Sequence, residues 1–516
     1  MAHAVPRHRN GTIRPWSAPI SFGIACVVFL SLLPTSSRAA DHFLTIGGGS
    51  SAENNQVSLE KNVLFLQQSL AAAGLGGVPH EILFTDGNAG SRDLVYVDPR
   101  NTVPRVNLLL GEIFDHADGL DQQYRAHAIP RLWGPSGRQG INKWFNTIGS
   151  KLDDGDRLFI YFTGHGGSGR GRPPADQTLA MWNEPGMTVH EFNTLLDKLP
   201  PKVSVVLIMV QCFGGGFADV IYDGADPGKG LSSRNRCGFF ATLPTRYAAG
   251  CTSDVDEENY KEYSTYFWAA LYGKTRSGEK VPPPDFDSDG KVSLAEAHAY
   301  ALIHSDTIDI SMKTSDVFLR KYSSYRAPGG ADLLPADADY DRLLAAAMPA
   351  DKAVLEGLSA ALVLEGPDRV RGARAEADKL ALQRKTIERR MASLRDARNQ
   401  LGRNLQAHLK SRWPELGNPL HPQAAKILAE QADEVVRWIE SAPAFKDFDA
   451  KGQEIDRLDD QSTDLERKWV KYQRFIRTAE SVALAANLPK VAKQEVLDRY
   501  KTLVELEGGE MDAKER

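Results

Sequence analysis

Two residues that can do covalent chemistry stand beside glycines at the ends of apolar runs. "LFIYFTGHGG" carries His165, and "VVLIMVQCFGGG" carries Cys212. A cysteine thiolate is a nucleophile. An imidazole beside it can take the thiol proton and later protonate a leaving amine. Either residue alone is often structural, but the glycine-flanked pair predicts a catalytic dyad.

The glycines beside the pair have a chemical use of their own. A peptide backbone can approach a glycine closely because no side chain stands in the way. Backbone amides at such turns can donate hydrogen bonds to the oxyanion that forms on an attacked carbonyl. We therefore expect the amide of Gly166, and a second amide at the turn of Cys212, to face the reacting carbonyl.

A second group of polar side chains lies in "DFDSDGKVSLAE", residues 285–296. The ligand positions of an EF-hand calcium loop are one, three, five, seven, nine and twelve, with glycine at six. These positions are held by Asp285, Asp287, Asp289, Lys291 (through its carbonyl), Ser293 and Glu296. The prolines at 282–284 exclude an entering helix. The sequence therefore predicts a half-motif that binds Ca²⁺ as a structural ion.

The runs around His165 and Cys212 alternate between strand-like and helical patterns from about residue 41 to 275. We expect strands at 42–49, 80–88, 156–167, 203–212 and 238–244, and helices at 57–74, 140–152, 188–200 and 262–273. Such alternation predicts an α/β fold with a mainly parallel sheet sandwiched by helices. Because sites in these sheets lie at the carboxyl ends of strands, His165 and Cys212 should face each other there.

Two other stretches of this region have weaker patterns. Residues 89–135 hold several Gly and Pro residues and are interpreted as a long, irregular surface insertion. "IGGGSS" at 46–51 lacks the second half of a dinucleotide-binding loop. We interpret it as a strand-end turn near the active site.

The C-terminal part changes composition towards Ala, Leu, Arg, Glu and Lys, and predicts an all-α, coiled-coil-like region. Apolar residues recur there at alternating three- and four-residue steps, first along 380–405, where two arginines interrupt the seam, and again along 455–479. These seams fit an antiparallel helix pair within the chain, or a module for partner binding or self-association. The predicted organisation is a signal peptide at 1–39, a peptidase domain at 40–280, the calcium loop with flanking helices at 281–335 and the helical region at 336–516.

The N-terminus predicts export. Arg7, Arg9 and Arg14 precede an apolar stretch at 20–33 and small residues near a cleavage site at 39–40. This is the pattern of a secretory signal peptide, and the apolar stretch is short for a membrane span, which an uncleaved anchor, the alternative, would need. We expect a secreted or periplasmic protein with no membrane span after signal removal. The net charge of −5 gives no sign of a nucleic-acid partner.

Export changes how the cysteines are interpreted, because disulfides persist outside the cytosol. Cys26 would leave with the signal, and Cys212, Cys237 and Cys251 would remain. An odd number suggests one pair and one free thiol. Cys237 and Cys251 flank an expected strand and are the favoured pair, which leaves Cys212 free. Three free, buried cysteines are the open alternative.

The two strand motifs resemble those of the caspase–haemoglobinase clan of cysteine peptidases, which includes legumain, caspases and gingipains. The segment "GFFATLPTRYAAGCTSDVDEENYKEYSTYFWAAL" is similar to the stretch that follows the nucleophile in legumain-type enzymes. The resemblance covers about residues 42–275. It implies a caspase-like sheet, with His165 as the catalytic histidine, Cys212 as the nucleophile, and the Gly166 and Cys212 amides as the oxyanion hole.

The chain departs from the clan at positions that set specificity. Legumain-like enzymes carry an acid two residues before the nucleophile, where Val210 stands, and an Arg-His pair where Ser58 and Leu59 stand. The Gln-Ala-Cys and pocket arginine of caspases are also absent, so cleavage after Asn or Asp is unsupported. Five acids after the fifth strand could include one for an Arg or Lys pocket, although each singly fits a solvated loop better: Asp254, Asp256, Glu257, Glu258 and Glu262.

The sequence thus predicts an exported cysteine endopeptidase that hydrolyses peptide bonds of a protein or peptide substrate and is stabilised by calcium. The alternative is a catalytically weak or inactive caspase-like scaffold whose helical tail binds protein partners. The intact pair of His165 and Cys212 favours the enzyme, and the missing specificity residues favour the scaffold.

Overall fold

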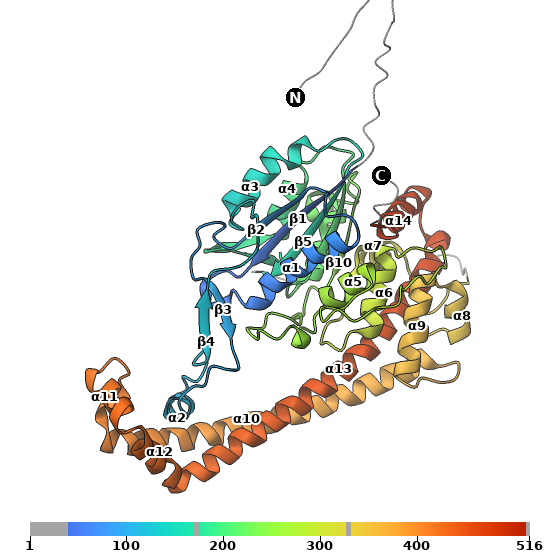
Figure 1. The fold of residues 1–516 in the computed structure, drawn as a ribbon. Helices are drawn as coiled ribbons and strands as arrows, with labels where there is room; N and C mark the ends of the chain where they lie inside the picture. The colour runs from blue at the N-terminus through green and yellow to red at the C-terminus, as the bar shows by residue number, and fades with distance from the viewer. Residues whose placement is uncertain (1–39, 170–175, 327–331, 512–516) are drawn as a thin grey trace, which may run out of the picture. The chain divides into compact units, whose positions relative to one another are not determined.

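The computed structural model describes residues 40–169, 176–326 and 332–511 (Figure 1). The predicted signal peptide at 1–39 lies outside these residues. No helix of the described residues is long and apolar enough to cross a membrane.

A mostly parallel sheet forms the centre of the α/β part, as the alternation of patterns predicted. Within the described residues six strands pair in the order β11-β10-β9-β5-β1-β2, and only β10 and β11 run antiparallel. The strands are β1 (Asp41–Gly48), β2 (His80–Phe84), β5 (Arg157–Gly164), β9 (Ser204–Met209), β10 (Arg236–Phe240) and β11 (Met312–Lys313). A small sheet of β6 (Gly166–Gly167), β7 (Thr178–Met181) and β8 (Glu184–Thr188) follows the end of β5.

Helices cover both faces of the sheet, because the strands are apolar on both sides. On β5, Ile160 and Phe162 face a core shared with α3 (Arg138–Thr147) and α4 (Val189–Leu196). Phe159 and Tyr161 face the opposite core, which α1 (Val57–Ala72), α5 (Tyr263–Tyr272), α6 (Leu294–His304) and α7 (Thr314–Tyr322) cover (Figure 1). The α/β sandwich predicted from sequence is therefore the observed fold class.

The segment at 89–135 was wrongly interpreted as irregular. It forms an antiparallel ribbon of β3 (Leu94–Val97) and β4 (Gln122–Arg125), with α2 (Arg105–Phe114) between the two strands. The apolar face of α2 packs into a core with α10, α11, α12 and the start of α13. Its Gly and Pro residues gave the impression of a loop, and the long-range packing that stabilises α2 leaves no local signal.

The C-terminal region is all-α, as predicted. It consists of α8 (Tyr340–Ala346), α9 (Pro349–Ala361), α10 (Arg369–Arg412), α11 (Pro422–Glu430), α12 (Ala432–Ser441), α13 (Pro443–Val491) and α14 (Gln494–Glu507). Its two long helices pair with each other, since Arg374 bonds Glu480 (2.8 Å) and Arg384 bonds Glu466 (2.7 Å). Moving along α10 from Arg374 to Arg384, the partner on α13 moves back from Glu480 to Glu466, so the two helices are antiparallel.

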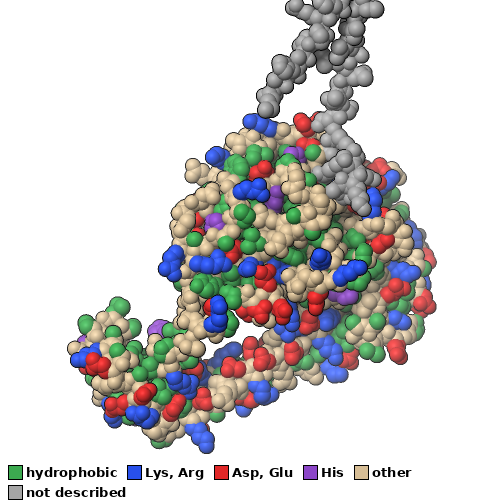
Figure 2. Space-filling model, viewed as in Figure 1, with side chains coloured by type: hydrophobic (Ala, Val, Ile, Leu, Met, Phe, Trp, Pro, Cys, Tyr) green, Lys and Arg blue, Asp and Glu red, His purple; other side chains and the backbone are tan. Residues whose placement is uncertain are grey.

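The two arginines that interrupt the first seam have partners in the structure. Arg384 bonds Glu466 of the facing helix, and Arg398 bonds Glu112 of α2 while its guanidinium lies 4.0 Å from the ring centroid of Phe448. Basic and acidic side chains alternate along the outside of these helices (Figure 2). The helix pair within one chain is therefore what the structure contains, and self-association stays a prediction.

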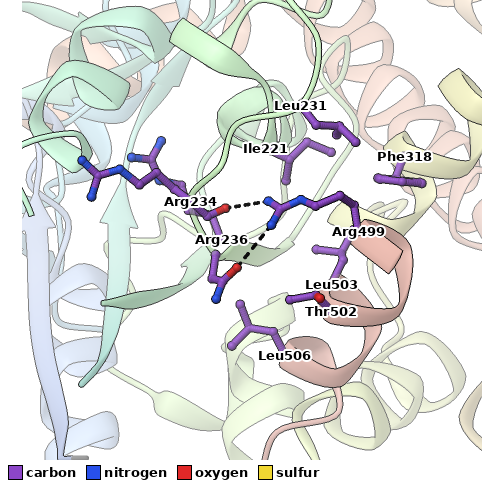
Figure 3. Close-up of a pocket in the computed structure, with 10 residues that line it drawn as sticks. Ile221, Leu231, Arg234, Arg236, Phe318, Arg499, Thr502, Leu503 and Leu506 are labelled. Atoms are coloured by element: carbon purple, nitrogen blue, oxygen red, sulfur yellow. Dashed lines mark hydrogen bonds between the residues drawn. The ribbon is translucent and has the colours of Figure 1, made fainter. Parts of the chain in front are cut away.

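The last helix, α14, packs on the α/β part rather than standing apart. Arg499 donates to the carbonyl oxygens of Ser232 (2.6 Å) and Arg234 (3.0 Å), just before β10. Figure 3 draws the bond to Arg234. Leu503 of α14 and Leu488 of α13 belong to the core on the α5 side of the sheet. The cavity that Figure 3 draws beside Arg499 has a volume of about 20 Å³, which is room for about one water.

Candidate functional site

His165 and Cys212 lie at the carboxyl ends of neighbouring parallel strands. His165 follows β5 directly, and Cys212 comes three residues after β9, whose Met209 pairs with Phe162 of β5. A Cβ atom built on Gly166 would stand 2.1 Å from the carbonyl oxygen of Cys212. The predicted meeting of these two strand ends is confirmed, and the close approach explains why residue 166 has no side chain.

The His165 ring is held by the turn that follows β1. Its Nε2 lies 2.8 Å from the carbonyl oxygen of Asn54 and 2.9 Å from Oε1 of Gln56. Both oxygens can only accept, so Nε2 carries the ring proton of the neutral imidazole and Nδ1 keeps its lone pair. Nδ1 is therefore the ring atom able to accept a proton from a thiol.

The turn itself is held by its own asparagines. The Oδ1 atom of Asn54 accepts from the amides of Ser50 (2.7 Å) and Ser51 (2.9 Å). The side-chain amide of Asn55 donates to the carbonyl of Asp93, and the amide of Val95 in β3 donates to the carbonyl of Asn55. The "IGGGSS" turn was expected near the active site, but the role of the residues after it had no sequence signal.

The Cys212 sulfur lies against the segment at 246–249. The amide of Ala248 donates to Sγ at 3.3 Å, and Sγ lies 3.9 Å from the carbonyl oxygen of the same residue. The next residue, Phe213, adopts a left-handed conformation with φ 60°, and a short 3₁₀ helix, Gly214–Ile221, begins directly after it. Cys212 thus sits on a sharp turn between a strand and a helix. Among the described residues, no hydrogen bond joins its thiol to the His165 ring.

Burial keeps both side chains uncharged at neutral pH. Burial lowers the pKa of His165, and its bond to the Asn54 carbonyl offsets part of this effect. Burial raises the pKa of the Cys212 thiol; the Ala248 amide opposes the rise, and the carboxyl of Asp309 adds to it. The resting pair is therefore a thiol and a neutral imidazole.

The amides of Gly166 and Cys212 were expected to donate to an oxyanion, and the structure shows their surroundings. Within the described residues, no backbone carbonyl accepts a hydrogen bond from the Cys212 amide. Gly166 pairs with Leu179 in an antiparallel ladder, and the amide of Ala180 donates to the carbonyl of His165. Because hydrogen-bonded pairs alternate in such a ladder, the Gly166 amide points away from β7. Both amides named from the resemblance are thus available to a ligand.

The positions that depart from the clan are buried. Val210 is 5% exposed and belongs to the core on the α5 side of the sheet. Leu59 lies in a second core, and the hydroxyl of Ser58 accepts from the amide of Thr252. None of these side chains offers a charge to a substrate.

The acidic stretch after β10 is not a uniformly solvated loop. Glu262 is 3% exposed and bonds the guanidinium of Arg276 at 3.2 Å. Glu257 pairs with Lys61 at 2.7 Å, and Asp254 accepts from the side chain of Asn259. For Glu262 the solvated interpretation was wrong, and its charge is already matched inside the chain.

The favoured disulfide is absent. Cys212, Cys237 and Cys251 are all free thiols. Cys237 points from β10 into the core on the α5 side, whereas Cys251 packs against the cluster around α1 and β2. The side chains of Cys237 and Cys251 therefore pack in different cores. The two residues are close in sequence, but they do not form a disulfide.

The structure brings together half of the expected calcium ligands. Asp285, Asp287 and Asp289 each place a carboxylate oxygen within 4.8 Å of the others. The carboxylate of Glu296 instead accepts from the amides of Phe286 (2.6 Å), Asp287 (3.2 Å) and Ser293 (2.9 Å). Ser293 caps α6, and no helix precedes the loop, which agrees with the predicted half-motif.

The other face of this loop contacts the C-terminus. Ser293 forms an antiparallel bridge with Glu510, and the amide of Leu294 donates to the carbonyl of Gly509 at 3.0 Å. Lys291, at position seven, forms an ion pair with Glu510 at 2.6 Å. The loop therefore fastens the end of the helical region to the α/β part.

Comparison with known proteins does not place the chain in a family. No known protein family matches the sequence, and no curated protein matches it. Among solved structures, protein GSU0716 from Geobacter sulfurreducens is similar, with 11% sequence identity over 41% of this chain and 77% of that chain and a TM-score of 0.24. A likeness at this level carries no argument about function.

Proposed function

We propose that this protein is a cysteine endopeptidase in which Cys212 is the nucleophile and His165 is the general base and acid. The observation that carries the proposal is the juxtaposition of the two strand ends, with Gly166 against the Cys212 carbonyl. The fixed tautomer of His165, with its lone pair on Nδ1, supports it further.

In the proposed reaction, Nδ1 of His165 takes the thiol proton as Sγ of Cys212 attacks the peptide carbonyl carbon. The amides of Gly166 and Cys212 donate to the oxygen that gains the negative charge. The protonated imidazole then gives its proton to the leaving amine, and a thioester remains on Sγ. Water, deprotonated by the same imidazole, hydrolyses the thioester and restores the thiol.

The test is cleavage of a mixed peptide library by the full chain and by Cys212→Ala. The substitution removes one sulfur atom and should abolish cleavage while leaving the circular dichroism spectrum unchanged. Cys237→Ala removes a free thiol from the core on the α5 side of the sheet and is the matched control. Undiminished cleavage by Cys212→Ala would sink the proposal.

The second candidate is an inactive caspase-like scaffold whose helical tail binds protein partners. Two observations favour it: the pKa of Cys212 is raised, and the imidazole and thiol are not hydrogen-bonded. Iodoacetamide labelling of Cys212 across pH separates the candidates. A rate that falls in His165→Ala supports the enzyme, and a rate indifferent to this change supports the scaffold.

We also propose that the loop at 285–296 binds Ca²⁺. Three carboxylates within 4.8 Å repel one another unless a cation lies among them, and oxygen ligands are those that calcium takes. Asp285, Asp287 and Asp289 would hold the ion, while Glu296 would have to leave the amides it now accepts from. Isothermal titration with CaCl₂ tests the site, with Asp287→Ala as the variant expected to lose the binding heat.

A further inference from the structure

The segment at 246–249 touches the proposed nucleophile but has no regular structure of its own. It follows β10 and precedes the next helical turn as an irregular stretch. The amide of Ala248 reaches Sγ of Cys212, and the carbonyl of Arg246 accepts from the amide of Phe213 at 2.8 Å. Because no strand ladder fixes this segment, its position depends on contacts from other parts of the chain.

One such contact comes from the middle of α13. Glu466 accepts from the guanidinium of Arg246 at 2.6 Å through one carboxylate oxygen and from Arg384 of α10 at 2.7 Å through the other. The Arg246 guanidinium also lies 5.0 Å from the ring centroid of Trp469, one turn further along α13. Arg246 and Glu466 are about one-fifth exposed, so this contact is screened by solvent far less than an open surface pair.

A second contact comes from Arg474, eight residues along the same helix. Its side chain is 1% exposed and donates to the end of α6 and to the loop between α6 and β11. The acceptors are the carbonyl oxygens of Leu302 (3.1 Å), Ser305 (2.8 Å) and Asp309 (2.8 Å) and the hydroxyl of Thr307 (3.0 Å). A fully buried guanidinium with four acceptors fixes the loop that carries Asp309.

Asp309 passes this constraint on to the segment beside the sulfur. Its Oδ1 accepts from the amide of Ala249 at 2.7 Å, and its side chain is wholly buried. Arg474 thus bonds the carbonyl oxygen of Asp309, the carboxylate of Asp309 bonds the amide of Ala249, and the amide of the neighbouring Ala248 contacts Sγ of Cys212. Residues 466 and 474 are separated by eight residues, a little over two helical turns, and lie on the same side of α13.

We propose that α13 is a positioning element of the active site, in which Glu466 and Arg474 hold the segment at 246–249 against Cys212. The inference rests on the proposed peptidase function for its meaning, but the positioning itself can be measured at the sulfur. On this view the helical region is not only a module for partners, because the wall beside the nucleophile depends on it.

The test compares Glu466→Ala with Asp464→Ala, two residues away on α13, whose carboxylate is exposed and pairs with Arg467 on the same helix. Both variants lose one carboxylate, but only the first releases Arg246. We expect kcat for a peptide substrate to fall about tenfold in Glu466→Ala with KM little changed, because the lost contact acts on the reacting sulfur. Glu466→Gln keeps an acceptor for Arg246 and should recover part of the loss.

A second readout follows the sulfur without a substrate. Iodoacetamide labelling of Cys212, followed by peptide mass spectrometry at a pH where the thiol is ionised, should become about threefold faster in Glu466→Ala, because the covering segment is loosened. The double variant Arg246→Ala/Glu466→Ala should label no faster than Glu466→Ala, since the ion pair that holds the segment is already broken in the single variant. A change of melting temperature equal to that of Asp464→Ala excludes general destabilisation as the cause.

The outcomes separate this inference from the proposed function. If Glu466→Ala matches Asp464→Ala in both kcat and labelling rate, α13 does not position the site and the inference is overturned. If the wild-type chain cleaves no peptide but labelling still differs between the two variants, the endopeptidase proposal fails and the positioning role stands. Should Glu466→Ala prove unstable, Arg246→Ala serves for the same comparison because it breaks the same ion pair, and additive effects in the double variant count against the inference.

Discussion

The contact between Gly166 and the Cys212 carbonyl gives the most direct prediction about the site. In Gly166→Ala the new methyl group would stand 2.1 Å from that carbonyl oxygen and 2.6 Å from Cγ of Gln211. Real Cβ atoms essentially never come within 3.0 Å of such a neighbour, so the end of β5 or the turn of Cys212 must move by roughly 1 Å. The obstacle is a backbone atom, which no change of rotamer can remove.

The size of the effect follows from that displacement. A misplacement of about 1 Å at a reacting group costs on the order of 10²-fold in rate, or about 2.7 kcal/mol of transition-state stabilisation. The cost to folding should be of similar size, about 1–3 kcal/mol, as for other overpacked sites, which is less than the total stability of a typical domain. We therefore expect Gly166→Ala to stay folded and to lose about 10²-fold in kcat/KM.

The assay is steady-state hydrolysis of the best peptide from the library, with urea unfolding measured alongside. Gly167→Ala is the control in the same two-residue strand, because its Cβ would meet only the hydroxyl of Thr178, at 2.7 Å. That side chain can move without disturbing Cys212, so the loss should stay below about tenfold. A folded Gly166→Ala that keeps wild-type kcat/KM would refute the reasoning, because the two strand ends would then not need their close approach.

Four further outcomes can be checked. Burial raises the pKa of Asp309 to about 7, so the stability that its protonated carboxyl contributes is complete below about pH 4 and is lost as the pH rises through 7. Asp309→Asn should remove this decline in the free energy of unfolding by urea. Parallel profiles of the wild type and the variant from pH 4 to 8 would contradict the prediction. Val210→Glu places a charge in a core and should cost more than about 3 kcal/mol by urea unfolding, whereas Val363→Glu, at a position 76% exposed, should cost almost nothing. Added Ca²⁺ should raise the melting temperature of the wild type but not of Asp287→Ala, and equal shifts would remove the calcium proposal. Thiol titration in urea without reductant should find three thiols in residues 40–516, and a count of one would show that a disulfide forms.

Local patterns predicted the sheet well because each signal was short-range. Alternation of apolar runs and amphipathic stretches gave β1, β5, β9 and the helices between them within a few residues. Thr188, the first residue of the predicted helix at 188–200, caps α4 with a side-chain bond from the amide of Glu191. Gly273, which ended the predicted helix at 262–273, has φ +71° at the end of α5.

The misses share a long-range cause. The helix α2 is stabilised by packing on helices about 300 residues further along the chain, which no window of local sequence contains. The pairing of Cys237 with Cys251 was inferred from sequence spacing, whereas disulfides depend on the distance between Cβ atoms in space. Glu262 looked like one more acid of a solvated loop because its partner, Arg276, lies beyond the following helix.

The same distinction separates the chemistry of the site from its positioning. His165 and Cys212 could be singled out from the sequence because each follows its own apolar strand motif and stands beside glycines. The contacts that hold the two side chains could not be predicted from local sequence. The imidazole is held by a turn more than one hundred residues upstream, and the sulfur is covered by a segment that is bonded to α13. The two short motifs thus name a candidate pair, while the orientation of its side chains depends on contacts spread from Asn54 to Arg474. Substitutions far from both motifs should therefore change the rate of the proposed reaction, and Glu466 is the position where this consequence is easiest to measure.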